Sequence, residues 1–242
     1  MSITLEMREG LPVYAPAEGE GLMGLVILHG SEGPAAGWGH RFAAILASHG
    51  MVVIPFAYGE GDIWRAGRIA GVDLRQVLAA GEVLSRHERV RGVGLFGWSF
   101  GGGMALITSA LQGKAGVFKA VASHAGTDFV TGAWEPERRL VEGANRETLT
   151  AGVPAFVWPG EEEVLRPGAP LPLERISVPV FLSVGDADTV LSPQLTLNVA
   201  QRLRDLGREV DLLVAEGQGH GYTFDREPEL WARLLGFFGR YL

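Results

Sequence analysis

One serine in the chain stands in a motif that is suited to a catalytic nucleophile. Ser99 is the centre of the run Gly-Trp-Ser-Phe-Gly at residues 97–101, which matches the pattern G-x-S-x-G. An apolar stretch of strand character precedes the motif, and an apolar stretch of helical length follows it. A tight turn between them would lift the serine above a sheet, and the flanking glycines carry no Cβ atoms to collide in so sharp a bend. We therefore predict that Ser99 is a nucleophile.

A serine hydroxyl needs a neighbouring base to remove its proton, and six histidines compete for that role. His220 lies in a glycine-rich loop, residues 216–222, between the last predicted strand and the terminal helix. A base in that loop would reach the top of the sheet. His124 is the competing candidate because it ends a strand at the same edge. We predict that His220 is the base.

The other four histidines have simpler interpretations. His49 and His87 follow predicted helices, and we expect both to be solvated residues at helix ends. His40 lies at a helix start and is expected to cap it. His29 ends a strand beside a glycine-rich loop and is expected to support that loop.

A carboxylate is needed to hold the imidazole in the right tautomer. Asp188 follows a strong strand at a G-x-x-D spacing and is the predicted acid. Asp186 would then be a turn residue that bonds its own backbone. Asp128, just after the preceding strand, is a second alternative. The chain order of Ser99, Asp188 and His220 is the one typical of α/β-hydrolases.

Acyl transfer also requires donors for the developing oxyanion. The backbone N–H of Phe100 is the first candidate, and the N–H of Ser31, in the glycine-rich loop 29–33, is the second. A substrate pocket is expected from nearby aromatic and imidazole side chains, namely Trp98, His124, Trp134, Trp158 and Tyr222. The histidines and acids have no metal-ligand spacing, so neither a metal nor another cofactor is expected.

The elements that must position these residues alternate between short β-rich runs and amphipathic helical stretches. This pattern predicts one domain over residues 1–242, with a mostly parallel sheet of about eight strands and helices on both faces. The predicted strands are residues 2–7, 11–15, 24–28, 51–56, 93–96, 118–123, 178–184 and 210–215. The predicted helices are residues 39–48, 68–86, 102–111, 193–206 and 227–241.

One interval interrupts the alternation. Residues 127–176 contain no clean strand–helix unit, but they carry Trp134, Phe156 and Trp158 together with an acidic run and several prolines. A loop of this length within a compact domain is usually functional or disordered. Its aromatic content favours a cap-like insertion over the active site.

Composition narrows the classes of partner. The 242 residues carry a net charge of −7 without a Lys/Arg cluster, which argues against nucleic acid. No apolar run approaches the roughly 20 residues that span a bilayer, and the N-terminus has no signal-peptide character. We expect a soluble, cytoplasmic protein, a monomer or a homodimer, whose partner is a small-molecule ester or thioester.

The motif around Ser99, the G-x-x-D loop and residues 220–222 resemble the dienelactone-hydrolase-like branch of the α/β-hydrolases. Residues 30–33 and 176–188 are also similar to the C-terminal catalytic domain of acyl-CoA thioester hydrolases and bile-acid-CoA acyltransferases. The resemblance implies an α/β-hydrolase fold and a serine mechanism. Dienelactone hydrolases carry cysteine at the position of Ser99, and the acyl-CoA enzymes usually carry an additional N-terminal domain, so the substrate stays open.

Three functions follow as hypotheses. The first is hydrolysis of a small or medium carboxylic ester through an acyl-Ser99 intermediate. The second is hydrolysis of acyl-CoA or another thioester, for which Arg138, Arg139 and Arg146 would bind phosphates. The third is a non-catalytic ligand-binding protein of the same fold. A peptidase is disfavoured because the chain has no room for the large accessory domain that usually accompanies this fold in peptidases.

Overall fold

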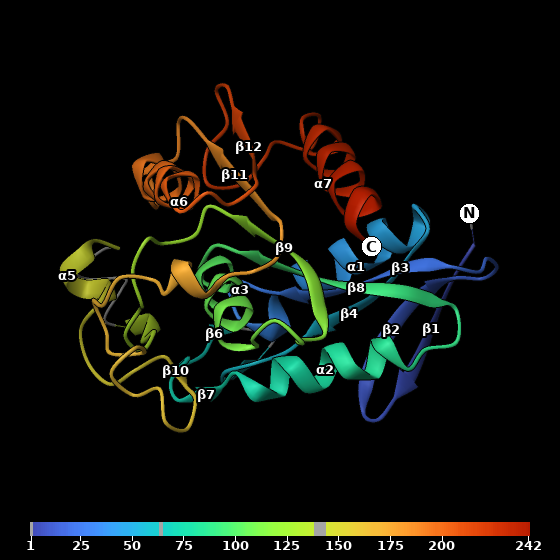
Figure 1. Ribbon diagram of the computed structural model, residues 1–242, viewed down its shortest axis with the longest axis horizontal. Coiled ribbons are helices and arrows are strands. Elements are labelled where there is room, and N and C mark those ends of the chain that lie inside the picture. Colours follow the sequence, from blue (N-terminus) through green and yellow to red (C-terminus); the bar gives the residue numbers. More distant parts are fainter. Residues whose placement is uncertain (1, 63–64, 138–143) are drawn as a thin grey trace.

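The computed structural model describes residues 2–62, 65–137 and 144–242, and its centre is an eight-stranded sheet (Figure 1). The strand order is β1-β2-β4-β3-β8-β9-β11-β12, and all neighbours from β4 to β12 run parallel. Only β2 is antiparallel to its neighbours β1 and β4. The strands are β1 (Ile3–Arg8), β2 (Leu11–Pro16), β3 (Leu22–Leu28), β4 (Met51–Phe56), β8 (Val90–Trp98), β9 (Phe118–His124), β11 (Val180–Gly185) and β12 (Val210–Ala215). This arrangement confirms the predicted α/β-hydrolase fold.

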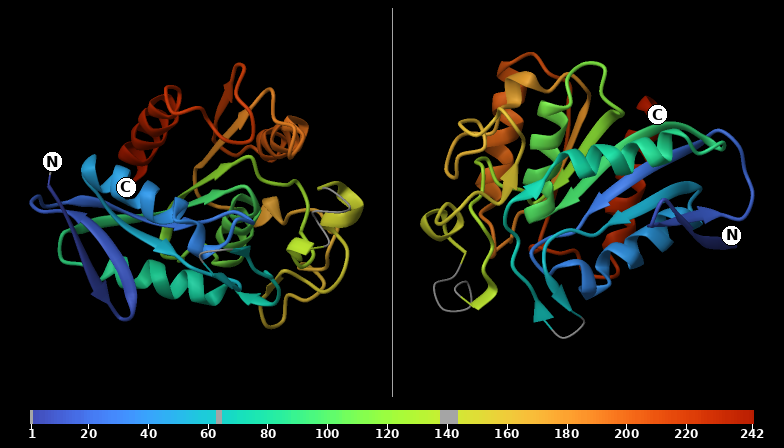
Figure 2. Two further views of the ribbon diagram at one scale, coloured as in Figure 1. Left: turned by 180° about the vertical axis from the view of Figure 1, so that it is seen from behind. Right: turned by 90° about the horizontal axis from the view of Figure 1, so that it is seen from below.

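Helices cover both faces of the sheet, as Figure 1 shows with α1 and α7 on one side and α2 on the other. They are α1 (Trp38–Ser48), α2 (Arg75–Ser85), α3 (Phe100–Leu111), α6 (Pro193–Asp205) and α7 (Glu227–Tyr241). Shorter elements are η1 (Pro34–Ala36), β5 (Gly61–Asp62), β6 (Arg65–Ala66), β7 (Val72–Asp73), α5 (Arg146–Leu149), β10 (Phe156–Val157) and η2 (Leu173–Arg175). Figure 2 shows the twist of the sheet, since its first and last strands point in clearly different directions.

Two apolar cores lie on the two faces because side chains along a strand alternate between them. On β3, Leu25 and Ile27 belong to the core that also holds buried residues of α1 and α7, whereas Val26 and Leu28 belong to the core that holds buried residues of α2, α3 and α6. All four side chains are almost fully buried. The central strands are therefore apolar throughout, which is the pattern expected of a parallel sheet that is covered on both faces.

The second long helix begins later than predicted. The prediction placed a helix at 68–86, but α2 begins at Arg75 and the preceding residues are extended. The N–H of Val72 donates to Ala155 O at 2.9 Å, and the N–H of Leu74 donates to Val157 O at 3.1 Å. These backbone groups pair with a distant segment of the chain, so helical periodicity was outweighed by tertiary hydrogen bonding.

The same pairing accounts for the insertion at residues 127–176. Its strand β10 lies parallel to β7, and Trp134 exchanges two backbone hydrogen bonds with Ile69. The largest buried side chains of its second half, among them Phe156 and Leu165, belong to the core on the α2 face of the sheet. The insertion is therefore packed against the body of the fold.

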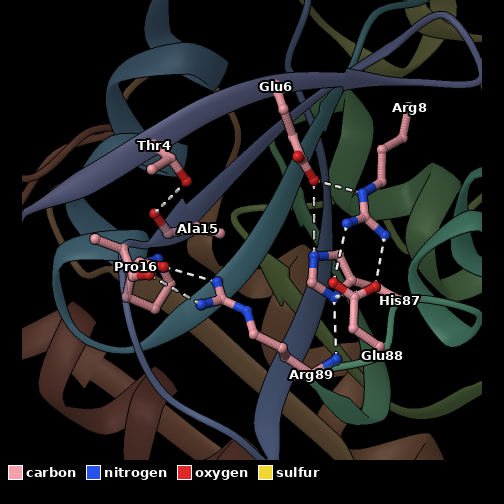
Figure 3. Close-up of polar contacts among 9 residues, drawn as sticks. Thr4, Glu6, Arg8, Ala15, Pro16, His87, Glu88 and Arg89 are labelled. Atoms are coloured by element: carbon pink, nitrogen blue, oxygen red, sulfur yellow. Dashed lines mark hydrogen bonds and ion pairs between the residues drawn. The ribbon is translucent and has the colours of Figure 1, made fainter.

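The N-terminal hairpin is tied to the start of β8 by a cluster of charged residues (Figure 3). Arg8 contacts both Glu6 and Glu88, and Arg89 donates to Pro16 O at 2.7 Å. His87 lies beneath this cluster and is buried, so the expectation of a solvated His87 was wrong. The reason is that the hairpin, some 80 residues earlier in the sequence, covers the end of α2.

Within the part of the chain that the structure describes, no helix combines the length and apolar character needed to span a membrane.

Candidate active site

Ser99 occupies the turn between β8 and α3. Its backbone has φ 54° and ψ −116°, a conformation that costs a non-glycine residue on the order of 1–3 kcal/mol. Both flanking glycines are needed sterically. A Cβ on Gly97 would overlap the carbonyl oxygen of Gly101, and a Cβ on Gly101 would overlap that of His29. The strained turn holds Ser99, which is 8% exposed, at the carboxyl end of the sheet.

His220 reaches Ser99 from the loop between β12 and α7. Its Nε2 lies 2.7 Å from Ser99 Oγ, and its Nδ1 lies 2.7 Å from Asp188 Oδ2. With Nδ1–H donating to the carboxylate, Nε2 is left to accept the serine hydroxyl proton. The structure thus brings together the three residues that the sequence singled out, in a continuous hydrogen-bonded chain.

The Asp188 carboxylate is fixed from both sides. Its Oδ1 accepts the backbone N–H groups of Val190 at 2.8 Å and Leu191 at 3.0 Å, while Oδ2 faces His220. Burial by itself would raise the pKa of Asp188. The hydrogen bond and charge of His220, together with the two N–H donors, outweigh burial and place the pKa below its usual value. The carboxylate is therefore charged and positioned to orient the imidazole.

His124, the alternative base, lies behind the site and is fully buried. Its Nε2–H donates to the backbone carbonyl of His220 at 3.0 Å, and its Nδ1 accepts from Ser183 Oγ at 2.9 Å. Burial lowers the pKa of His124 to about 4, so the ring is neutral near pH 7. It is placed to hold the His220 backbone.

The two alternative acids are engaged elsewhere. Asp186 accepts the N–H of Gly217 at 2.7 Å, so it ties the loop after β11 to the loop after β12 instead of bonding its own backbone. Asp128 accepts from Asn198 at 2.8 Å and pairs with Arg146 at 3.6 Å. The Arg146 guanidinium also lies over the ring of Phe129. Arg138 and Arg139 lie outside the described residues.

The loop after β3 borders Ser99 on the side expected for oxyanion donors. Ser31 lies in the turn closed by a hydrogen bond from Gly33 N to Gly30 O, and Phe100 opens α3, where first-turn N–H groups have no helical acceptor. His29 supports this loop as expected, because its Nδ1 lies 2.7 Å from Gly30 O and its ring stacks on Tyr58.

A cavity of about 480 Å³ opens beside His220. Its walls come from the loop after β3, from α1, from the end of β8 and from the loop that leads into α7. Most of the lining side chains are aromatic, and two carboxylates accompany them: the lining comprises Glu32, Trp38, Phe42, Trp98, His220, Gly221, Tyr222, Thr223, Phe224 and Glu227.

Of the five side chains expected in the substrate pocket, Trp98 and Tyr222 line this cavity. His124 lies beneath it, with its ring centroid 4.0 Å from that of Trp98. Trp134 contacts the ring of Phe100 on the other side of Ser99, and Trp158 lines a separate hollow between β7 and the insertion. Trp134 and Trp158 were expected to line the pocket because of their aromatic character, but both face the junction between the insertion and the sheet.

Sequence reasoning missed Glu32, Trp38, Phe42, Phe224 and Glu227 as lining residues of this cavity. Two signals were available for the three aromatic residues. Trp38 and Phe42 lie one helical turn apart at the start of the helix after the glycine-rich loop, and Phe224 follows His220 by four residues. Among the residues that the structure describes, no group of three or more His, Asp or Glu side chains is placed to hold a metal ion.

Solved structures with the same fold include peptidases and esterases. A puromycin-hydrolyzing peptidase from Mycobacterium tuberculosis aligns with a TM-score of 0.66 and 22% identity, over 99% of this chain and 39% of its own. A putative dienelactone hydrolase from Klebsiella pneumoniae aligns with a TM-score of 0.62 and 17% identity, over 100% of both chains. A truncated carbohydrate esterase from gut microbiota aligns at 0.64 and 17%, over 95% and 90%.

The chain thus spans about two fifths of the length of the peptidase. At 17–22% identity, the three structural similarities establish the fold alone. A search of curated protein sequences gave no match. The sequence model of the prolyl oligopeptidase family, by contrast, matches residues 40–242, which include Ser99, Asp188 and His220. The chain belongs to the prolyl oligopeptidase family and is a serine hydrolase of the α/β-hydrolase type.

Proposed function

We propose that the protein hydrolyses carboxylic esters through an acyl-Ser99 intermediate. The observation that carries this proposal is the chain of two 2.7 Å hydrogen bonds from Ser99 through His220 to Asp188. It supplies a nucleophile, a general base and an orienting acid in the geometry that acyl transfer requires.

Each residue has one task in the proposed reaction. Ser99 Oγ attacks the ester carbonyl carbon while its proton passes to His220 Nε2. The N–H groups of Phe100 and Ser31 donate to the oxyanion of the tetrahedral intermediate. When the bond to the alcohol breaks, His220 returns that proton to the leaving oxygen. Water then attacks the acyl group with His220 again as base, and Ser99 is regenerated. Asp188 stabilises the imidazolium in both steps.

Two observations support an ester as the substrate. Two of the solved structures that match this chain over 90% or more of their own length are named as a putative dienelactone hydrolase and a truncated carbohydrate esterase. The cavity beside His220 is compact and mostly aromatic, which suits a small or medium apolar group.

A peptide or amide bond is the second candidate, and membership of the prolyl oligopeptidase family favours it. The same triad can cleave an amide if His220 protonates the leaving amine. Hydrolysis of a thioester would use the same three catalytic residues, and the assay described next includes thioesters.

The deciding experiment measures kcat/KM for p-nitrophenyl esters of increasing acyl length, for the matched acyl-CoA thioesters and for the matched p-nitroanilides. We expect the esters to be the preferred substrates and Ser99→Ala to lower the rate at least about 10⁴-fold. Preference for anilides would establish the peptidase alternative, and preference for thioesters the acyl-CoA alternative. If wild-type protein neither turns over any substrate nor reacts with a fluorophosphonate, the catalytic proposal is wrong.

A further inference from the structure

The cavity beside His220 contains two carboxylates in different electrostatic situations. Glu227, in the first turn of α7, is held by Arg41 through two hydrogen bonds of 2.9 and 2.6 Å. Glu32, in the loop after β3, accepts the N–H of Gly30 at 2.9 Å. Among the described residues, no Lys or Arg forms an ion pair with Glu32. Within that part of the chain, Glu32 therefore lacks the cationic partner that Glu227 has.

Glu32 is also close to the reacting atoms. A Cβ built on Gly30 would overlap the Glu32 carboxylate and would lie 3.1 Å from Ser99 Cβ, so the carboxylate and the serine approach the same side of Gly30. Burial raises the pKa of Glu32, although its backbone hydrogen bonds and the nearby His220 oppose that rise. Removal from water thus disfavours the free carboxylate, and a bound cation would compensate it.

The walls of the cavity are suited to a cation as well. Aromatic faces attract cations, and three rings of this lining already do so in this molecule. The Arg41 guanidinium carbon lies 5.6 Å from the ring centroids of Trp38 and Phe42, and 5.2 Å from that of Phe224. The ring of Trp98 shares the lining with Glu32 and has no such cation over it among the described residues.

We propose that Glu32 and the neighbouring aromatic rings bind an ammonium group carried by the leaving alcohol or amine of the substrate. This inference rests on the proposed function because it takes the ligand to be a substrate. The binding of an ammonium group by Glu32 does not itself depend on catalysis. The leaving group is favoured over the acyl group because His220, which must protonate the leaving atom, lines the cavity together with the four residues that follow it. Phe100 and the described residues of the insertion do not line it.

The first test compares the binding of choline with that of 3,3-dimethyl-1-butanol. The two have the same shape and differ by one positive charge, so the comparison isolates the cation. Quenching of Trp38 and Trp98 fluorescence gives the affinities in the whole protein. We expect choline to bind about 10-fold more tightly than the neutral alcohol. Equal or weaker binding of choline to the wild-type protein would overturn the proposal, and this arm depends on no variant.

Two variants assign the effect to its residue. Glu32→Gln keeps the length of the side chain and an oxygen for the Gly30 N–H, and it should abolish the preference for choline. Glu163→Gln makes the same chemical change at an exposed carboxylate outside the cavity, and it should leave the preference intact. A preference that survives in Glu32→Gln would rule out Glu32 as the cation partner.

The hydrolysis of acetylcholine and of 3,3-dimethylbutyl acetate tests which part of the substrate enters the cavity. We expect a kcat/KM ratio of about 10 in favour of acetylcholine. If p-nitrophenyl esters are hydrolysed but acetylcholine has no advantage, the assignment to the leaving group is wrong. If choline binds selectively but no ester is cleaved, the cation site stands and the proposed hydrolase function fails.

Discussion

The two sides of Ser99 are both rich in aromatic residues, but the rings face different surroundings. On the His220 side, Trp38 and Phe224 are 41% and 73% exposed and border a cavity. On the side of the insertion, Phe156 is 1% exposed and packs on Phe100 at a ring-centroid distance of 5.3 Å. The exposed rings leave part of their surface open to a ligand in the cavity, whereas the buried ring holds the insertion against the sheet.

Aromatic content alone therefore does not locate a binding site in this sequence. The aromatic residues of the insertion were expected to cap the substrate, because a long loop rich in tryptophan is often functional. In the structure, its backbone pairs with β7 and its large side chains complete a core. We accordingly expect the residues on the His220 side to recognise the substrate and the residues of the insertion to stabilise the fold. Four substitutions test this expectation.

The largest effect is expected at Asp188. Asp188→Asn should lower kcat for a p-nitrophenyl ester by about 10⁴-fold, because the amide no longer stabilises the imidazolium or enforces its tautomer. Asp186→Asn is the control, since Asp186 lies two residues away and bonds Gly217 instead of His220. It should change kcat by less than about 10-fold. Equal losses in both variants would mean that loop order, and not the charge on Asp188, controls the rate.

On the insertion side, Phe156→Ala should lower the free energy of unfolding by about 3–5 kcal/mol, because it leaves a cavity in a closed core. Urea denaturation measures this loss. Below the transition, kcat/KM per folded molecule should stay close to that of the wild type. A selective loss of substrate affinity in a variant that remains folded would assign the insertion a part in recognition.

Beneath the site, His124 should make stability depend on pH. Its pKa is about 4 in the folded protein and about 6.5 in the unfolded chain, so the unfolded chain binds the additional proton between these values. The contribution of neutral His124 to the free energy of unfolding is therefore complete above pH 6.5. It is lost as the pH falls toward 4, and the loss reaches up to about 3 kcal/mol. As the pH is lowered from 7 to 4, the free energy of unfolding should therefore fall less steeply in His124→Asn than in the wild-type protein. Parallel curves for the two proteins would contradict this account.

The smallest effect on folding is expected at the exposed ring of the cavity. Phe224→Ala should change the free energy of unfolding by less than about 0.5 kcal/mol, because little apolar surface is buried there. Its KM for a leaving group that fills the cavity should rise about threefold, as the loss of one aromatic contact implies. An unchanged KM with reduced stability would reverse the comparison between the two sides.

The sequence was sufficient where the decisive signal is local. The alternating apolar runs predicted the strands of the sheet, the glycines around Ser99 predicted the sharp turn, and the chain order of the polar residues indicated which loops would meet. Each of these signals extends over a few neighbouring residues, and steric rules act on it directly.

Other features follow only from contacts between distant segments in the tertiary structure. These contacts begin α2 at Arg75 instead of residue 68, bury His87 under the hairpin and tie Asp186 to Gly217. The tertiary structure also places Glu32 beside Ser99, with no Lys or Arg ion-pair partner among the described residues, and the neighbours of Glu32 in the sequence give no sign of this. Burial and hydrogen-bond partners depend on how the whole chain packs, and local periodicity carries no information about that.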